Sequence, residues 1–515
     1  MLGSKVMQDT TAYSVVPVRT VAPPAADIAG SVRMADFKEH LRREAQRSEA
    51  AHEFVPDADY EASDGIRESL AAIRSGAPIV FISGRAGTGK SRLIDYLKSM
   101  PGGAHQAVVA PTGVAALSLR AVTVHSFFRL PVGILNSDAL DNDVKFDPSI
   151  RHIRRLVIDE ISMVRADVLD AIDQRLRHLQ TPSLPFGGVQ VVMVGDFLQL
   201  PPVVTNEDRE LLARLRYETP FAFSSRVMQE NPIRVATLRK VWRQVDPAMI
   251  EALGSIREGR NVAQAIDWLN ERCVGPHRSG KTPLLLTATR SAADSHNQAG
   301  ISELRSKLNG GQPDLIFQAR SEGSFECPRA TLPAPRRLAL LPGARVMAVR
   351  NDPGGAFVNG SLGQVIEMND GAGDLEDAYV SVKFDGSDNV IRIFAARWTS
   401  ARQIWSEADG SISDEDTGTF CQIPLTMGHA ITIHKSQGLT LEDVRIDLGR
   451  GAFAPGQLYV ALSRAKSIEG LSLAQPISMR DVRVDEMLVK FLDWARSANN
   501  MDFEASPSCV EHVSA

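Results

Sequence analysis

The stretch "PIVFISGRAGTGKSRLIDYLKSM", residues 78–100, constrains the fold of this chain more than any other. An apolar, β-branched run ends in a glycine-rich turn, and an amphipathic helical pattern follows at once. The turn fits the pattern G-x-x-x-x-G-K-[ST] at Gly84, Gly89, Lys90 and Ser91. Backbone N–H groups of such a turn, together with the following helix N-terminus, favour bound phosphate. The chain is therefore expected to contain an α/β domain that binds a nucleotide.

Each residue type in this turn has an expected chemical role. Lys90 is expected to reach the β- and γ-phosphates, and the Ser91 hydroxyl to ligate Mg²⁺. A chance match in a glycine-rich loop is the alternative, and the strand before the turn and the helix after it argue against a chance match. The other expected nucleotide-binding residues of the turn are Gly84, Ala86, Gly87, Thr88, Gly89 and Arg92.

Two acids follow another apolar run, "RRLVIDE". Parallel strands present ligands at their carboxyl ends, and Asp159 and Glu160 stand at such an end. Asp159 is expected to hold Mg²⁺ through water, and Glu160 to polarise the attacking water. Acids also commonly cap strand-to-helix turns, so the two acids alone are weak evidence for a nucleotide site. Together with the phosphate-binding turn they become strong evidence.

The stretch "QVVMVGDFLQLPPV", residues 190–203, begins as a buried strand and ends in polar and stiff residues. Gln199 is expected to sense the γ-phosphate, because an amide can donate to phosphate and accept from water. Asp196 is expected to support that geometry, and Pro201-Pro202 to form a rigid exit from the cleft. The alternative is a loop that is polar by chance.

Composition limits the remaining possibilities. A chain of 515 residues is expected to form two to four domains. No apolar run approaches the roughly 20 residues that cross a bilayer, and no secretory signal is recognisable. The four cysteines are far apart, which argues against disulfides or zinc and suits a reducing cytosol. The net charge of −5 by itself argues against nucleic acid, but an acidic protein can still line one groove with positive charge.

Two α/β regions are expected, at 56–235 and 236–500, because apolar strand-like runs alternate with helical patterns in both. Within the second region, 360–425 holds short strands separated by Gly, Asn and Asp, which predicts an inserted small β-barrel.

Three other segments are expected to lack regular structure. The arm at 1–55, rich in Ala, Pro and Ser, is expected to be largely disordered. The acidic segment 406–418 is expected to be a loop, and 501–515 a flexible tail.

Two arginines outside the phosphate-binding turn are candidates for γ-phosphate contact. Arg243 lies in "VWRQVD" and Arg464 in "YVALSRA". An arginine that stabilises charge on a transferring phosphoryl group is worth about 10³ to 10⁵ in rate. A surface ion pair is the commoner role for any single arginine and remains the alternative.

Eight segments taken together resemble a known family. They are "GRAGTGKS", "APTGVAAL", "TVHSFF", "LVIDEISMV", "PFGGVQVVMVGDFLQLPPV", "VWRQVD", "ITIHKSQGLTLEDV" and "YVALSRAKSIEGL". In this order, across about 60–475, they resemble the Pif/RecD-type branch of superfamily 1 DNA helicases, and the Pif-like subgroup most. The resemblance implies two RecA-like P-loop domains, with the β-rich insertion as an SH3-like module.

The resemblance also implies roles for single residues. Arg243 and Arg464 match the family's γ-phosphate arginines, and Gln437 and Gly438 match its motif that couples nucleotide to DNA. The segment 131–150 falls where the family places a strand-separating wedge. The implied DNA-binding residues are Thr112, Gly113, His125, Ser126, Phe127, Pro201, Asn359, His434 and Ser436.

The chain departs from the family pattern at one place. The family usually has an adenine-reading glutamine upstream of the P-loop, and "SDGIRESLAAIRSG" contains none. Arg67 or Glu68 is a candidate substitute, and relaxed adenine selectivity is the alternative.

The function implied is an ATP- and Mg²⁺-dependent helicase that moves 5′ to 3′ on single-stranded DNA and unwinds tailed or forked duplexes in replication, repair, recombination or telomere-like maintenance. G-quadruplexes and RNA–DNA hybrids are left open as substrates. A monomer in a bacterial or phage-like cytoplasm is expected. The alternatives are a translocase that strips proteins from DNA and a DNA-binding scaffold with a regulatory ATP site. The set Lys90, Asp159, Glu160, Arg243 and Arg464 argues against the scaffold.

Overall fold

The computed structural model describes residues 63–498, except 101–104, 113–114, 117–118, 120, 132, 138–139, 141–147, 281, 308–313, 326–331, 353–355, 358, 386 and 407–410. The arm at 1–55 and the tail at 501–515 lie outside the described residues. Gly113 and much of the expected wedge segment lie outside them as well.

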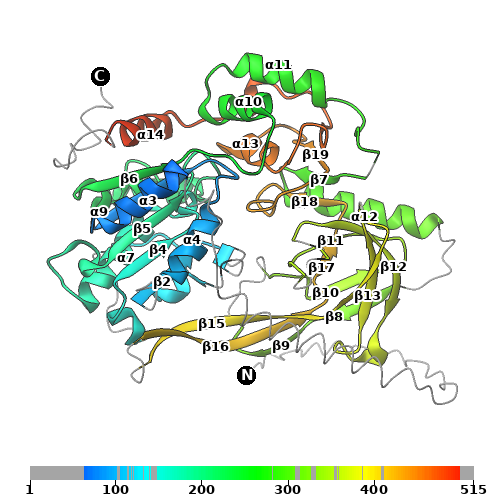
Figure 1. The fold of residues 1–515 in the computed structure, drawn as a ribbon, viewed down its shortest axis with the longest axis horizontal. Helices are drawn as coiled ribbons and strands as arrows, with labels where there is room; N and C mark the ends of the chain where they lie inside the picture. Colours follow the sequence, from blue (N-terminus) through cyan, green and yellow to red (C-terminus); the bar gives the residue numbers. More distant parts are fainter. Residues whose placement is uncertain are drawn as a thin grey trace, which may run out of the picture.

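The first domain is built on a six-stranded parallel sheet with the strand order β3-β2-β4-β5-β1-β6 (Figure 1). The parallel sheet expected from the apolar runs is confirmed, and Phe81 of β1 lies between Met193 of β5 and Val235 of β6. The sixth strand extends to Leu238, so the expected boundary at 235 falls inside a strand. The strands are β1 (Ile79–Gly84), β2 (Gln106–Ala110), β3 (Val122–Thr123), β4 (Arg155–Ile158), β5 (Gln190–Gly195) and β6 (Ile233–Leu238).

Successive side chains of each strand point to opposite faces of this sheet, so one strand contributes apolar residues to both faces. Val80 and Ile82 of β1 join the core beneath α3 (Asp64–Arg74) and α4 (Lys90–Ser99). Ile79 and Phe81 join the opposite core, which α7 (Ala166–Leu179) covers. Because both faces of β1 are buried, its residues from Ile79 to Ile82 are all apolar, as is typical of central strands in parallel sheets.

The last described helix, α14 (Glu486–Ala498), returns to the first domain, although its sequence lies within the region expected to form the second. Figure 1 shows it beside β6. Leu488, Phe491, Leu492 and Ala495 form an apolar stripe at helical spacing that packs on the first core. The Phe491 ring stacks on Phe223, with centroids 4.6 Å apart. Burial of this stripe places the helix there.

The second domain contains a four-stranded parallel sheet with the order β18-β7-β19-β20. Its apolar core includes side chains of three helices, α10 (Pro247–Glu258), α11 (Val262–Cys273) and α13 (Gln457–Leu462). A longer helix, α12 (Arg290–Lys307), follows β7. The strands are β7 (Leu284–Thr287), β18 (Ala430–Thr432), β19 (Val444–Asp447) and β20 (Leu471–Leu473).

A five-stranded antiparallel sheet, β14-β13-β12-β11-β17, is inserted in the chain between β7 and β18. It begins before residue 360, at β11, and encloses its own apolar core. Its likeness to an SH3 module stays a prediction. The strands are β11 (Arg345–Ala348), β12 (Leu362–Asn369), β13 (Tyr379–Phe384), β14 (Val390–Phe394) and β17 (Leu425–Met427), with β8 (Leu315–Gln318) and β10 (Arg337–Leu340) paired nearby.

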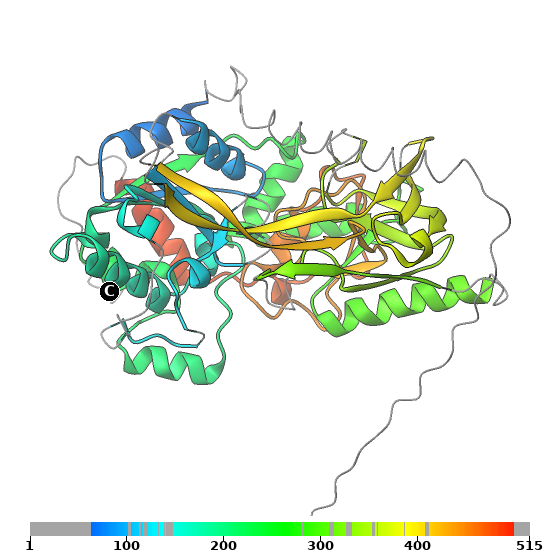
Figure 2. The ribbon, with the colours of Figure 1, turned by 90° about the horizontal axis from the view of Figure 1, so that it is seen from below.

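The acidic segment 406–418 was expected to be a loop, and this expectation is wrong for its described part. Residues from Ser411 onward form β16 (Ser411–Gln422), which pairs with β15 (Ala396–Ser406) and β9 (Arg320–Gly323). Backbone pairing along both neighbours outweighs the low strand propensity of Asp and Glu. Figures 1 and 2 show the hairpin extending to the first domain, where β15 lies beside η3 (Pro148–Arg151).

None of the helices in the described ranges combines the length and the apolar character that crossing a bilayer requires.

Candidate active site

The glycine-rich turn after β1 contains two glycines in left-handed backbone conformations. Gly87 and Gly89 have positive φ angles of 77° and 88°, where residues with a Cβ are strained. A Cβ on Gly87 would lie 2.5 Å from Cβ of Arg243. Ser91 is exposed in the first turn of α4, beside the half-buried Arg92. The Thr88 hydroxyl donates to the carbonyl of Arg85 at 2.9 Å and closes the turn.

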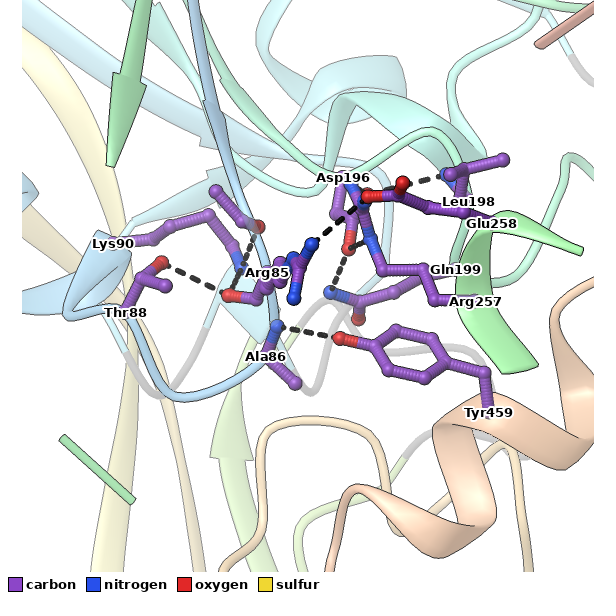
Figure 3. Close-up of polar contacts among 11 residues, drawn as sticks. Arg85, Ala86, Thr88, Lys90, Asp196, Leu198, Gln199, Arg257, Glu258 and Tyr459 are labelled. Atoms are coloured by element: carbon purple, nitrogen blue, oxygen red, sulfur yellow. Dashed lines mark hydrogen bonds and ion pairs between the residues drawn. The ribbon is translucent and has the colours of Figure 1, made fainter. Parts of the chain in front are cut away.

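Lys90 lies inside this loop. Its Nζ donates to the carbonyl oxygens of Gly84 at 2.9 Å and Arg85 at 3.1 Å (Figure 3). Burial lowers the pKa of Lys90, while the charges of Glu160, Asp196 and Asp159 oppose that shift. The ammonium group is thus held among acids at the carboxyl edge of the sheet.

Asp159 and Glu160 follow β4 directly. Burial, and next the charge of Glu160, raise the pKa of Asp159 to about 7. Glu160 has φ +47°, a left-handed backbone conformation. This conformation costs a non-glycine residue about 1–3 kcal/mol and is often found at functional sites. Its Oε2 accepts a hydrogen bond of 3.1 Å from Nε2 of Gln437, which belongs to the second domain.

The donors available for a divalent cation fit Mg²⁺. A buried carboxyl whose neutral form is favoured, beside a second acid, is a site where added positive charge would be stabilised. Mg²⁺ prefers oxygen ligands and usually combines one or two carboxylates with substrate phosphates. Among the described residues, no group of three or more His, Cys, Asp or Glu side chains is placed to hold a metal ion. Asp159 and the Ser91 hydroxyl remain the candidates.

Gln199 and Asp196 follow β5 at the same edge. Nε2 of Gln199 donates to Oδ2 of Asp196 at 3.3 Å, and the Leu198 N–H donates to Oδ1 at 3.3 Å. Arg257 of α10 donates to both oxygens of the same carboxylate (Figure 3). Asp196 therefore bonds both to Gln199 and to an arginine of the second domain, while its expected support of γ-phosphate sensing stays a prediction.

The second domain contacts the phosphate-binding loop directly. The Ala86 N–H donates to the hydroxyl of Tyr459 at 3.0 Å (Figure 3). Arg243, next to Gly87, donates to the carbonyl oxygens of Ser463 at 2.9 Å and Gly438 at 3.4 Å. The loop is therefore shared by the two domains.

Arg464 is fully buried and faces its own domain. Its guanidinium donates to the carbonyl oxygens of Val460, Ser436 and Leu439 and to the Ser463 hydroxyl. Burial, and next the charge of Arg243, lower the pKa of Arg464 to about 9. Its contact with a γ-phosphate stays a prediction.

The candidate DNA contacts of the first domain lie after β2 and β3. Oγ1 of Thr112 accepts from the Ala115 N–H. His125 and Ser126 are half-buried in α6 (Val124–Phe127). Phe127 is buried and its ring meets Phe128 edge-on, with centroids 4.9 Å apart, which leaves little of the ring for a base. Pro201, two residues after Gln199, is partly exposed.

In the second domain, the candidates are divided between buried and accessible positions. The Ser436 hydroxyl is buried and donates to the carbonyl of Ile433 at 2.8 Å. The ring of His434 lies nearly parallel to that of Phe453, with centroids 6.4 Å apart. Phe453 is 56% exposed, and it was not among the residues expected to contact DNA. The Asn359 N–H donates to Oδ1 of Asn351.

The candidates for reading adenine lie on α3. Arg67 is exposed, and Oε1 of Glu68 pairs with Arg239 at 2.8 Å near the end of β6. Their role with a base stays a prediction.

Comparison with known proteins gives one consistent result. Residues 61–279 match the family model described as "PIF1-like helicase". The chain is similar to the "ATP-dependent DNA helicase Pif1" of Bdellovibrio bacteriovorus, with 30% identity over 450 residues that cover 85% of this chain and 93% of that protein. It is 32% identical to the "ATP-dependent DNA helicase PIF1" of Homo sapiens over 88% of this chain and 66% of that protein, so it spans slightly less than two thirds of the human relative.

Two solved structures of Pif1 from Bacteroides agree with this. The complex with ADP-AlF4 has a TM-score of 0.74 and 31% identity, over 86% of this chain and 99% of that one. The complex with ADP-AlF3 and single-stranded DNA has a TM-score of 0.59 and 32% identity, over 85% and 98%. The resemblance seen in the sequence is confirmed: this chain belongs to the PIF1-like helicase family.

Proposed function

We propose that this protein hydrolyses ATP to move 5′ to 3′ along single-stranded DNA and to separate duplex ahead of it. The observation that carries the proposal is the shared phosphate-binding loop. Ala86 bonds to Tyr459, and Glu160 bonds to Gln437, so groups around the expected nucleotide come from both domains. A nucleotide bound there would change the relation between the domains, which is what a motor requires.

The residues of the first domain would do the chemistry. Lys90 would pair with the β- and γ-phosphates once it leaves the carbonyl oxygens of Gly84 and Arg85. Mg²⁺, held by Ser91 and by Asp159, would neutralise phosphate charge. Glu160 would orient the attacking water and accept its proton.

The residues of the second domain would make hydrolysis depend on closure. Arg243 already lies beside Gly87 and bonds to Gly438 and Ser463. Arg464 would need to leave its buried carbonyl partners to meet the γ-phosphate. Gln437 would report the state of Glu160 to the segment that carries His434.

Single-stranded DNA would run across the carboxyl edges of both parallel sheets. Thr112, Gly113, His125, Ser126, Asn359 and His434 would grip phosphates and sugars, which is largely independent of sequence. Bacteroides Pif1 has been crystallised bound to single-stranded DNA, and another solved Pif1 structure addresses unwinding at forked duplex DNA by two coordinating helicases. We infer the same partners here, with G-quadruplexes and RNA–DNA hybrids as further candidates, and a cytoplasmic monomer as the acting form.

ATP hydrolysis with and without a thymidine oligonucleotide tests the proposal. Single-stranded DNA is expected to stimulate turnover about tenfold or more, because DNA binding favours the closed state. Lys90→Ala should abolish turnover, since it removes the main phosphate cation. Turnover that ignores DNA, or a Lys90→Ala rate within about tenfold of wild type, would contradict the proposal.

A further inference from the structure

Arg257 stands at the end of α10, yet its side chain crosses into the first domain. It is 3% exposed, and its Nη2 and Nε donate to Oδ1 and Oδ2 of Asp196 at 2.6 and 3.0 Å. Two parallel bonds between a guanidinium and a carboxylate are among the strongest hydrogen-bond arrangements in proteins. Loss of either partner would leave the other charge buried and unpaired.

The same carboxylate holds the side chain of Gln199. Oδ2 of Asp196 accepts from both Arg257 and Gln199, and Oδ1 accepts from Arg257 and from the Leu198 N–H. Asp196 is fully buried. The conformation of residues 196–199, here termed the sensor loop, therefore depends on a side chain of the second domain.

A second contact connects the same end of α10 to the phosphate-binding loop. Oε1 of Glu258 accepts from Nη1 of Arg257 at 3.1 Å and from Nη2 of Arg85 at 2.9 Å. A Cβ on Gly254, one turn earlier, would lie 2.8 Å from Nη1 of Arg85, so this glycine leaves room for the arginine. One helix end thus holds the phosphate-binding loop and the sensor loop together (Figure 3).

Gly456, at the start of α13, packs the sensor loop from another side. A Cβ there would lie 2.4 Å from the carbonyl oxygen of Gln199 and 2.6 Å from that of Leu198. The backbone of the sensor loop therefore fits against the second domain without space for one more carbon atom.

We infer that Arg257 is a positioning residue that brings Gln199 into its working place only when the two domains are together. This inference rests on the proposed function, and it deepens it by naming the contact through which closure reaches the γ-phosphate sensor. With the domains apart, Asp196 would lose the guanidinium of Arg257. The Asp196 carboxylate, which accepts the hydrogen bond from Gln199, would then no longer be held in place. With the domains together, Gln199 is held by a carboxylate whose two oxygens are already bound by Arg257.

Arg257→Lys tests the inference, because lysine keeps the charge but cannot form the two parallel bonds. DNA-stimulated kcat for ATP is expected to fall about tenfold, because the sensor is misplaced, while the KM for ATP stays within about threefold of wild type. Arg272→Lys on α11 is the matched control, since Arg272 is only partly buried and pairs with the exposed Glu271. Arg257→Lys turnover within about twofold of wild type would overturn the inference.

A double variant separates positioning from a general structural role. Gln199→Ala alone and Gln199→Ala with Arg257→Lys are expected to have the same kcat, because both changes disable one step. If the losses of kcat caused by the two single substitutions multiply in the double variant, the inference is overturned. If Arg257→Lys fails to fold, Asp196→Asn with Arg257→Gln removes both buried charges together, and the same selective loss of kcat is expected. Near-wild-type turnover of that pair would also overturn it.

The outcomes distinguish the inference from the proposed function. Wild-type protein that hydrolyses ATP in response to DNA, with Lys90→Ala inactive, upholds the proposed function whatever the Arg257 variants do. Wild-type protein that shows no response to DNA would overturn both.

Discussion

The side-chain amide of Gln437 donates a hydrogen bond of 3.1 Å to Oε2 of Glu160. Glu160 follows β4 of the first sheet, and Gln437 follows β18 of the second. The segment of Gln437 also contains His434, a candidate DNA contact. One hydrogen bond thus links the acid proposed to activate water with the segment proposed to hold DNA.

Glu160→Gln should separate binding from chemistry. The glutamine oxygen can still accept from Gln437, but it cannot take a proton from water. Hydrolysis is expected to fall by about 10²- to 10⁴-fold while nucleotide affinity is kept. Fluorescent-nucleotide titration and single-turnover hydrolysis measure the two quantities. A loss of affinity as large as the loss of rate would mean that Glu160 is structural.

Asp159 should make the nucleotide-free protein less stable as the pH rises. The pKa of this carboxyl is 3.8 in a reference peptide and about 7 in the folded protein, so the folded state binds the extra proton between these values. Stability therefore falls as the pH rises through that window and is level above it. Asp159→Asn has no carboxyl that titrates at this position. The melting temperature of the variant minus that of the wild type should therefore rise from about pH 5 to about pH 7 and then stay constant. A difference in melting temperature that stays constant from about pH 5 to about pH 7 would contradict the raised pKa of Asp159.

Tyr459→Phe should weaken the contact between the domains at the phosphate-binding loop. The substitution leaves the Ala86 N–H without its acceptor, which costs about 1–3 kcal/mol for a buried donor. If that cost falls on the closed state, kcat/KM for ATP should drop roughly tenfold, since about 1.4 kcal/mol is a factor of ten. Tyr379→Phe is the control, because its hydroxyl bonds to Glu367 within the insertion. Equal activity of both variants would show that the Tyr459 contact is not used.

Gly456→Ala should prevent close packing of the sensor loop. Gly456 has φ +70°, and an added Cβ would meet two carbonyl oxygens of the loop. Gly449→Ala is a matched control, because its φ is +58° but a Cβ there meets nothing within 4 Å. Both variants carry left-handed strain of about 1–2 kcal/mol, but only Gly456→Ala should lose DNA-stimulated hydrolysis. Equal ATPase rates would contradict the tight fit.

Much of the fold is predictable from the sequence because its signals are local. The run before Gly84 and the run before Asp159 are apolar throughout, as buried parallel strands are, and both enter one parallel sheet. The order of the motifs then identifies the family. The position of α14 is not local information, because its apolar stripe could cover either domain. The strand β16 is equally hidden, since its acidic sequence disfavours strands and only its neighbours fix it.

The candidate site divides in the same way. Lys90, Asp159 and Glu160 are recognisable because their spacing follows from strand, turn and helix geometry. Arg257 pairs with a residue 61 positions away in the chain, and its sequence "SIREG" looks like an ordinary exposed helix end. Arg464 was recognised by its motif, yet its buried orientation depends on carbonyl oxygens that only the folded domain brings together.

Paired unwinding assays would show whether the protein moves in one direction on single-stranded DNA. Two duplexes of equal sequence would carry either a 5′ or a 3′ single-stranded tail, with ATP and Mg²⁺ present. Only the 5′-tailed duplex is expected to be unwound by the wild-type protein, and Lys90→Ala is expected to unwind neither duplex. Unwinding of the 3′-tailed duplex, or of neither duplex by the wild-type protein, would contradict 5′-to-3′ movement driven by ATP.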